Sequence, residues 1–133
     1  MIPTPPQIAV VDDEDSVRKA LARLLRAAGM GVESFSSGGD FLRFLPDHAI
    51  DCVILDLHMP TVSGFDILER LAEQRSPVAV VVITGHDTPE SQARVLAAGA
   101  AAYLLKPVDE QVLLGAIATA IGRSGNPVHA ESS

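Results

Sequence analysis

Several residues that follow short apolar runs have the chemistry needed to bind a metal ion and a phosphoryl group. Asp12 and Asp13 follow QIAVV, Asp56 follows CVIL, Thr84 follows VAVVVI and Lys106 follows AYLL. Clustered carboxylates repel one another, and they commonly stay ionised by sharing a hard divalent cation. Mg²⁺ is the natural candidate, because it takes oxygen ligands and binds carboxylates together with phosphate oxygens. We therefore predict a Mg²⁺ site, provided that these runs are neighbouring strands.

The threonine and the lysine would complete a phosphoryl-transfer site beside that metal. Lys106 supplies a positive charge and Thr84 a hydroxyl donor, which are the groups needed to hold the oxygens of a phosphoryl group. Asp56 would be the acceptor, because a carboxylate is an established phosphoryl nucleophile. The protein would then mainly have to position the reacting groups and neutralise charge.

Each of these residues also has a simpler interpretation. Asp12 and Asp13 could cap the first helix, since aspartate is favoured at helix N-termini. Thr84 could be only the last β-branched residue of a strand, and Lys106 only a solvated charge at the edge of a sheet. Their joint occurrence at the ends of adjacent strands favours the phosphoryl site.

Hydrophobic periodicity predicts the elements that would position these residues. Val17, Leu21, Leu24 and Leu25 fall on one face of an amphipathic helix, and Gly29 closes it. The same strand–helix unit recurs along the chain. The predicted strands span 7–12, 31–35, 51–56, 78–84 and 102–105, and the predicted helices span 15–28, 39–45, 64–74, 89–98 and 109–121.

The composition of these strands predicts their places in a sheet. Strands one, three and four are apolar throughout, as expected of parallel strands that are covered on both faces. Strand two contains Glu33 and Ser34, and strand five is short, so both suit the edges. The predicted fold is α/β, a doubly wound five-stranded parallel sheet of the flavodoxin-like (βα)5 kind with strand order 2-1-3-4-5. Ligands bind such sheets beyond the carboxyl ends of the strands.

Composition narrows the class of protein. The 133 residues, 47% of them hydrophobic, fit one domain, which we place at 7–122 between flexible tails at 1–6 and 123–133. A net charge of −7 disfavours direct binding to nucleic acid. The N-terminus lacks a signal-peptide pattern, no apolar stretch is long enough to cross a bilayer, and Cys52 reads as a buried thiol. We expect a cytoplasmic protein with no membrane contact.

The chain resembles the receiver domains of bacterial two-component response regulators, over roughly residues 7–121. The joint occurrence of the matching elements in this order is highly specific, although each element alone is weak. The matching segments are VVDDE at 10–14, LDLHMP at 55–60 with Gly64 after it, VVITGH at 81–86 and YLLKP at 103–107. The segments SFSSGGDFL and ITGHDTPESQARVLAAGA also resemble receivers of the nitrogen-fixation regulator type.

The resemblance implies an acceptor and a metal site. Asp56 would accept a phosphoryl group from the phosphohistidine of a histidine kinase or phosphotransfer protein. Asp12, Asp13 and Asp56 would hold Mg²⁺, with the backbone carbonyl of His58 as a further ligand.

The resemblance also implies a conformational switch. Thr84 and Lys106 would bind the new phosphate, and Thr84 would move toward it. Tyr103 would then turn inward and alter the face formed by helix four, strand five and helix five. An aromatic residue on an edge strand is otherwise a packing residue, and that alternative stays open for Tyr103. The bond between Lys106 and Pro107 is typically cis in such domains.

Two histidines and a glycine pair have less certain roles. His58 and His86 each follow a candidate site residue by two positions, where their side chains could overhang the phosphate and tune its hydrolysis. An exposed loop histidine is an equally good description of either. The pair Gly38-Gly39 lacks a phosphate-binding loop pattern around it and is predicted to form a turn before the second helix.

The resulting expectation is a phosphorylation switch, which catalyses only its own phosphoryl transfer and dephosphorylation and is otherwise not an enzyme. Only 12 residues follow Ile121, so output is expected through a separate effector protein unless the chain is a piece of a longer regulator. The chain would be a monomer or a phosphorylation-dependent dimer. The alternatives are an interaction module that works without phosphate and, less favoured, a phosphatase with an aspartyl nucleophile.

Overall fold

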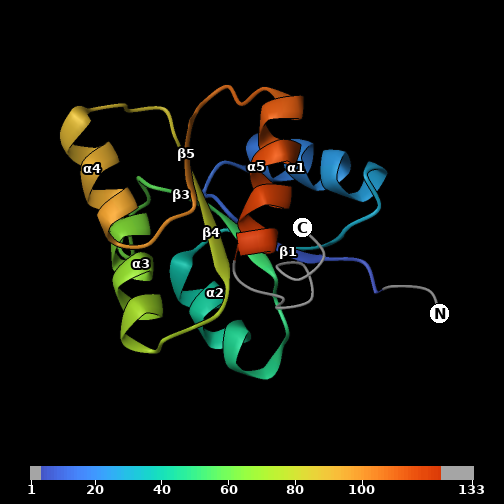
Figure 1. The fold of residues 1–133 in the computed structure, drawn as a ribbon, viewed down its shortest axis with the longest axis horizontal. Helices are drawn as coiled ribbons and strands as arrows, with labels where there is room; N and C mark the ends of the chain where they lie inside the picture. Colours follow the sequence, from blue (N-terminus) through green and yellow to red (C-terminus); the bar gives the residue numbers. More distant parts are fainter. Residues whose placement is uncertain (1–3, 124–133) are drawn as a thin grey trace.

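The computed structural model describes residues 4–123, and the predicted tails fall largely outside this range. Within it, strands and helices alternate along the chain (Figure 1). The strands are β1 (Gln7–Val11), β2 (Gly31–Phe35), β3 (Cys52–Asp56), β4 (Ala79–Thr84) and β5 (Ala102–Leu105). The helices are α1 (Asp15–Ala27), α2 (Gly38–Phe44), a 3-10 turn η1 (Leu45–Asp47), α3 (Gly64–Glu73), α4 (Pro89–Ala97) and α5 (Glu110–Arg123).

The strands form one parallel sheet in the order β2-β1-β3-β4-β5, which confirms the predicted fold and strand order. The three central strands are buried along almost their whole length, whereas the edge strands β2 and β5 are partly exposed. Burial on both faces explains why the central strands are continuously apolar. The sheet therefore supplies a rigid edge at which β1, β3 and β4 end side by side.

The helices cover both faces of the sheet. On one face, side chains of α1 and α5 pack on the strands, and Figure 1 shows these two helices lying together. On the other face, side chains of α2, α3 and α4 form the second core, which includes the fully buried Phe41. In the described residues, no helix combines the length and apolar character needed to span a bilayer.

The prediction of a turn at Gly38-Gly39 was wrong, because both residues belong to the first turn of α2. Ser37 caps this helix by accepting a hydrogen bond from the Asp40 N–H. A side chain at Gly38 would lie 2.7 Å from Ile67 and 2.9 Å from Val62. The glycine therefore serves close packing of α2 on α3, which local sequence patterns do not reveal.

Thr61 has a positive φ of 68°, which is rare for a β-branched residue. It lies in a tight three-residue turn that the Val62 N–H closes on the Pro60 carbonyl oxygen at 2.8 Å. This conformation costs roughly 1–3 kcal/mol for a residue other than glycine. The loop after β3 is thus held in shape by its surroundings.

Thr61→Gly is expected to raise the free energy of unfolding by roughly 0.5–1 kcal/mol, because relief of this strain outweighs the added freedom of the unfolded chain. Chemical denaturation with the same change at Thr119, an exposed residue of α5, provides the comparison. Thr119→Gly is expected to destabilise, since glycine is unfavourable inside helices. A loss of stability in Thr61→Gly would show that the turn carries no strain.

Candidate functional site: a carboxylate cluster at the strand ends

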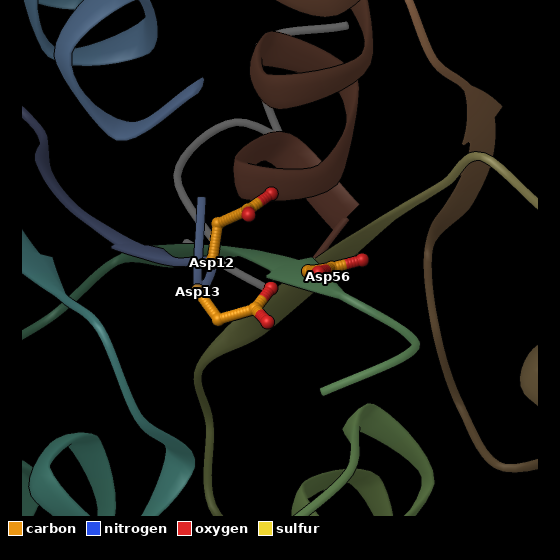
Figure 2. Close-up of side chains that lie close together, drawn as sticks. All are labelled: Asp12, Asp13 and Asp56. Carbon is orange, nitrogen blue, oxygen red and sulfur yellow. The ribbon is translucent and has the colours of Figure 1, made fainter. Parts of the chain in front are cut away.

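The predicted site residues come together at the carboxyl edge of the sheet. Asp12 and Asp13 follow β1, and Asp56 is the last residue of β3, its immediate neighbour (Figure 2). Each of the three aspartates has a carboxylate oxygen within 4.8 Å of the others. Thr84 ends β4 on the next strand, and Lys106 follows β5. The parallel arrangement is what places these distant segments at one edge.

Asp12 is the most deeply enclosed of these carboxylates, with an exposed fraction of 0%. Its Oδ1 accepts a hydrogen bond from the Glu14 N–H at 2.9 Å. Its Oδ2 is buried and makes no hydrogen bond, although Lys106 Nζ lies 3.0 Å away in an ion pair. A buried carboxylate oxygen without a hydrogen bond is costly and is well suited to a cation.

Lys106 is the positive charge within this cluster. Its Nζ lies 2.9 Å from Glu14 Oε1 and 3.6 Å from Asp56 Oδ1, in addition to its contact with Asp12. Burial by itself would lower the pKa of Lys106, but the neighbouring carboxylates, Glu14 first, raise that pKa by more. Lys106 is therefore protonated and partly compensates the negative charges.

Asp56 is only 3% exposed, and its pKa is raised to about 7. Burial is the largest cause, and the negative charge of Asp12 adds to it. Lys106 and the His58 N–H, which is 3.4 Å from Asp56 Oδ1, act in the opposite direction without overcoming these effects. One lysine is thus insufficient to keep this cluster fully ionised, and a divalent cation would lower the pKa further.

The donor set fits a hard cation such as Mg²⁺. The three aspartates offer oxygen ligands only, and the exposed position of Asp13 leaves an open side for water. Asp12 Oδ2, which makes no hydrogen bond and is paired with Lys106 Nζ, fits the same donor set. The role of the His58 carbonyl oxygen as a ligand stays a prediction.

Thr84 is fully buried, and its hydroxyl group is engaged by the loop that follows it. Thr84 Oγ1 accepts a hydrogen bond from the His86 N–H at 3.0 Å and donates to the His86 carbonyl oxygen at 3.3 Å. The loop is therefore fastened to the end of β4 by the same hydroxyl that is expected to meet a phosphate.

Tyr103 pairs with Val82 in the sheet and packs against the core under α4. Its hydroxyl is buried and makes no hydrogen bond, while burial and the Asp87 carboxylate raise its pKa. An unsatisfied buried hydroxyl favours any rearrangement that gives it a partner. The bond between Lys106 and Pro107 is cis, as the resemblance implied.

His58 and His86 lie in the loops that follow Asp56 and Thr84, and we call this side of the cluster its mouth. Their ring centroids are 5.7 Å apart, with the planes at 84°, and both residues are exposed. The His58 ring also meets the edge of Phe65 at 6.2 Å, and the Arg94 guanidinium lies over Phe65 at 4.0 Å. The spacing in the sequence left two interpretations open for each histidine, overhang of the phosphate or an exposed loop position, and it did not predict their contact with each other.

Sequence reasoning assigned no role to Glu14 and Arg18. Glu14 binds Lys106, and Arg18 donates a hydrogen bond to the Asp12 carbonyl oxygen at 2.8 Å. The one feature of the sequence that could have indicated a role for them is their position shortly after Asp12 and Asp13. The contact of Glu14 depends on the placement of the loop after β1 beside Lys106, and the contact of Arg18 depends on the conformation of that loop.

Gly64 allows α3 to begin directly against the end of β3. A side chain here would lie 2.7 Å from the Asp56 carbonyl oxygen and 2.8 Å from Leu57 Cα, both backbone atoms. Its own N–H donates to the Leu57 carbonyl oxygen at 2.9 Å. Gly64 thus fixes the backbone that carries the candidate acceptor.

Gly64→Ala is expected to lower the free energy of unfolding by on the order of 2 kcal/mol, because the backbone of the β3–α3 loop must move. Gly39→Ala is a matched control, since the nearest contact there is the flexible Arg43 side chain at 3.5 Å. Thermal or urea unfolding of both variants measures the difference. Equal stability of the two variants would contradict the importance of this close approach.

Comparison with known proteins agrees with this geometry. Residues 8–118 match the response regulator receiver domain family. The chain belongs to this family. Receivers are signalling domains of two-component systems, and the sequence-based identification is therefore confirmed.

The relatives support the more specific resemblance. The response regulator protein TmoT of Ectopseudomonas mendocina is 40% identical over 114 residues, which cover 86% of this chain and 52% of TmoT. The transcriptional regulatory protein FixJ of Azorhizobium caulinodans is 34% identical over 117 residues, covering 88% of this chain and 56% of FixJ. The chain thus spans about half the length of these curated relatives.

Solved structures agree with the fold. A response regulator receiver protein from Burkholderia phymatum is 40% identical, with a TM-score of 0.78, and the match covers 88% of this chain and 95% of that one. The carboxylate cluster described above therefore lies in a receiver fold.

Proposed function

We propose that this receiver, at residues 7–122, is a switch that accepts a phosphoryl group on Asp56. The single observation that carries this proposal is the meeting of three carboxylates and one lysine at the ends of adjacent strands. Asp56 Oδ would form a bond to phosphorus while the bond between phosphorus and a donor histidine nitrogen breaks. The donor is then released as a free imidazole.

The proposed metal ligands are Asp12, Asp13 and Asp56, with the His58 carbonyl oxygen as a further candidate. When bound, Mg²⁺ would neutralise charge on the transferring phosphoryl group and on the carboxylates. Lys106 would contribute the remaining positive charge, because its Nζ already lies 3.6 Å from Asp56 Oδ1. Thr84 would donate its hydroxyl to a phosphoryl oxygen.

A phosphate at Asp56 would compete for the Thr84 hydroxyl. That hydroxyl now holds the His86 backbone, so its departure would release the β4–α4 loop. Tyr103 lies beneath this loop, and its buried hydroxyl has no hydrogen-bond partner. Movement of the loop would therefore allow the Tyr103 side chain to change position and find one. The three residues form a physical path from the acceptor to α4.

The output surface is proposed to be the face formed by α4, β5 and α5. Each of these elements has one exposed large apolar side chain: Leu96 in α4 is 44% exposed, Leu105 in β5 is 49% exposed and Val112 in α5 is 53% exposed. Exposed apolar side chains of this size are suited to a protein partner. We propose a histidine kinase or phosphotransfer protein as donor, an effector protein as output and a cytoplasmic location.

The proposal is tested by incubating the purified chain with Mg²⁺ and acetyl phosphate and measuring its intact mass. We expect one phosphoryl group per chain, and none when EDTA replaces Mg²⁺. Absence of added mass with both acetyl phosphate and a cognate kinase would refute phosphorylation. An interaction module that works without phosphate would then be the better description.

A further inference from the structure

The imidazoles of His58 and His86 are brought together from two different loops. Their ring centroids are 5.7 Å apart, at an interplanar angle of 84°. Both backbones are tied to buried site residues: the His86 N–H to Thr84 Oγ1 at 3.0 Å, and the His58 N–H to Asp56 Oδ1 at 3.4 Å. The pair is thus positioned by the site and does not arise from two unconstrained loops.

We propose that His58 and His86 form a second metal site, for a borderline transition-metal ion such as Zn²⁺, at the mouth of the carboxylate cluster. A Zn–N bond is about 2.0–2.1 Å, so two imidazoles on one tetrahedral ion have centroids roughly 5 Å apart. The observed centroid separation of 5.7 Å is close to that value. Water can supply the remaining ligands, because both residues are exposed.

The ring nitrogens of both histidines are available for a metal. In the part of the chain that the structure describes, neither ring makes a hydrogen bond or an ion pair; each has only ring contacts. His48 differs, because its Nδ1 lies 2.8 Å from the Phe44 carbonyl oxygen and its ring is stacked on Phe44 at 3.6 Å. His48 is therefore a natural control.

Ligand chemistry separates this site from the carboxylate cluster. Mg²⁺ prefers oxygen ligands, whereas imidazole suits Zn²⁺, so both ions can be bound at once. Cys52 does not compete for Zn²⁺, because it is fully buried and burial raises its pKa to about 12. The negative charge of the aspartates beside the two imidazoles favours any cation that approaches this mouth.

The inference concerns the unphosphorylated chain, so its test needs no phosphoryl donor. Zn²⁺ binding is measured by titration calorimetry in excess Mg²⁺, which occupies the carboxylates. His129 lies outside the described residues and is replaced by Ala in every protein compared. We expect one Zn²⁺ per chain, with affinity reduced on the order of tenfold or more in His58→Ala and in His86→Ala. His48→Ala should bind Zn²⁺ unchanged.

A second measurement locates the ion. In NMR spectra of the imidazole nitrogens, Zn²⁺ should shift the resonances of His58 and His86 and leave those of His48 in place. Undiminished Zn²⁺ affinity in either variant at the mouth, or shifts confined to other residues, would overturn the proposal. Loss of binding in Asp13→Asn alone, with the histidine variants unaffected, would assign Zn²⁺ to the carboxylates and would also overturn it.

Discussion

Asp56→Asn is expected to abolish phosphoryl addition from acetyl phosphate in Mg²⁺, with the rate reduced by at least about 100-fold. The amide is nearly the same size as the carboxylate but is a poor nucleophile and a weaker Mg²⁺ ligand. Intact mass against time measures the effect. The change leaves the Asp12 and Lys106 ion pair in place, at 3.0 Å, so the rest of the cluster is kept.

The control for this variant is Asp47→Asn, which removes an aspartate from the η1 turn without touching the cluster. It should accept the phosphoryl group at the wild-type rate. Phosphoryl mass that persists in Asp56→Asn would place the acceptor elsewhere, with Asp13 the first residue to consider. Loss in both variants would indicate a general effect of the substitutions.

Stability of the metal-free protein is expected to fall as the pH rises from about 4 to about 7. The pKa of Asp56 is raised from 3.8 to about 7 in the folded chain, first by burial and then by Asp12. Over this window the folded state holds a proton that the unfolded state has released, so stability decreases with pH. The loss from this group is on the order of 2–4 kcal/mol above the folded pKa.

Asp56→Asn should remove most of this dependence, because an amide does not titrate. In EDTA at mildly alkaline pH the variant should therefore be more stable than the wild type, and the difference should vanish near pH 4. Urea unfolding across this range measures the curves. Mg²⁺ should stabilise the wild type more than the variant, since it binds the folded carboxylates. If the free energy of unfolding of the two proteins changed with pH in the same way, a raised pKa of Asp56 in the folded chain would be contradicted.

The hydrophobic periodicity of the sequence was sufficient to predict the fold. Continuous apolar runs with helices between them leave few arrangements other than a doubly wound parallel sheet, and the boundaries differ by one or two residues from those predicted. Helix boundaries were the weak point, as at Gly38. A side chain at Gly38 would clash with Ile67 and Val62, residues that are remote in the sequence, so the reason for a glycine there is visible only in the folded chain.

The candidate site was accessible from the sequence because each member ends a strand, and parallel strands end at one edge. Asp12, Asp13 and Asp56 could be brought together by that rule alone. The sequence did not predict how their surroundings differ. Asp12 is fully buried while Asp13 is exposed, and this difference arises from the packing of loops over the edge of the sheet.

The sequence by itself therefore determined the fold, the family and the identity of the residues at the strand ends. These features depend on hydrophobic periodicity and on residue type, both of which can be read without knowledge of the tertiary structure. Only the tertiary structure decided what those residues contact. The ion pairs of Lys106, the raised pKa of Asp56 and the contact between His58 and His86 depend on distances of a few ångströms between separate loops. Such distances follow from packing, which residue spacing does not encode.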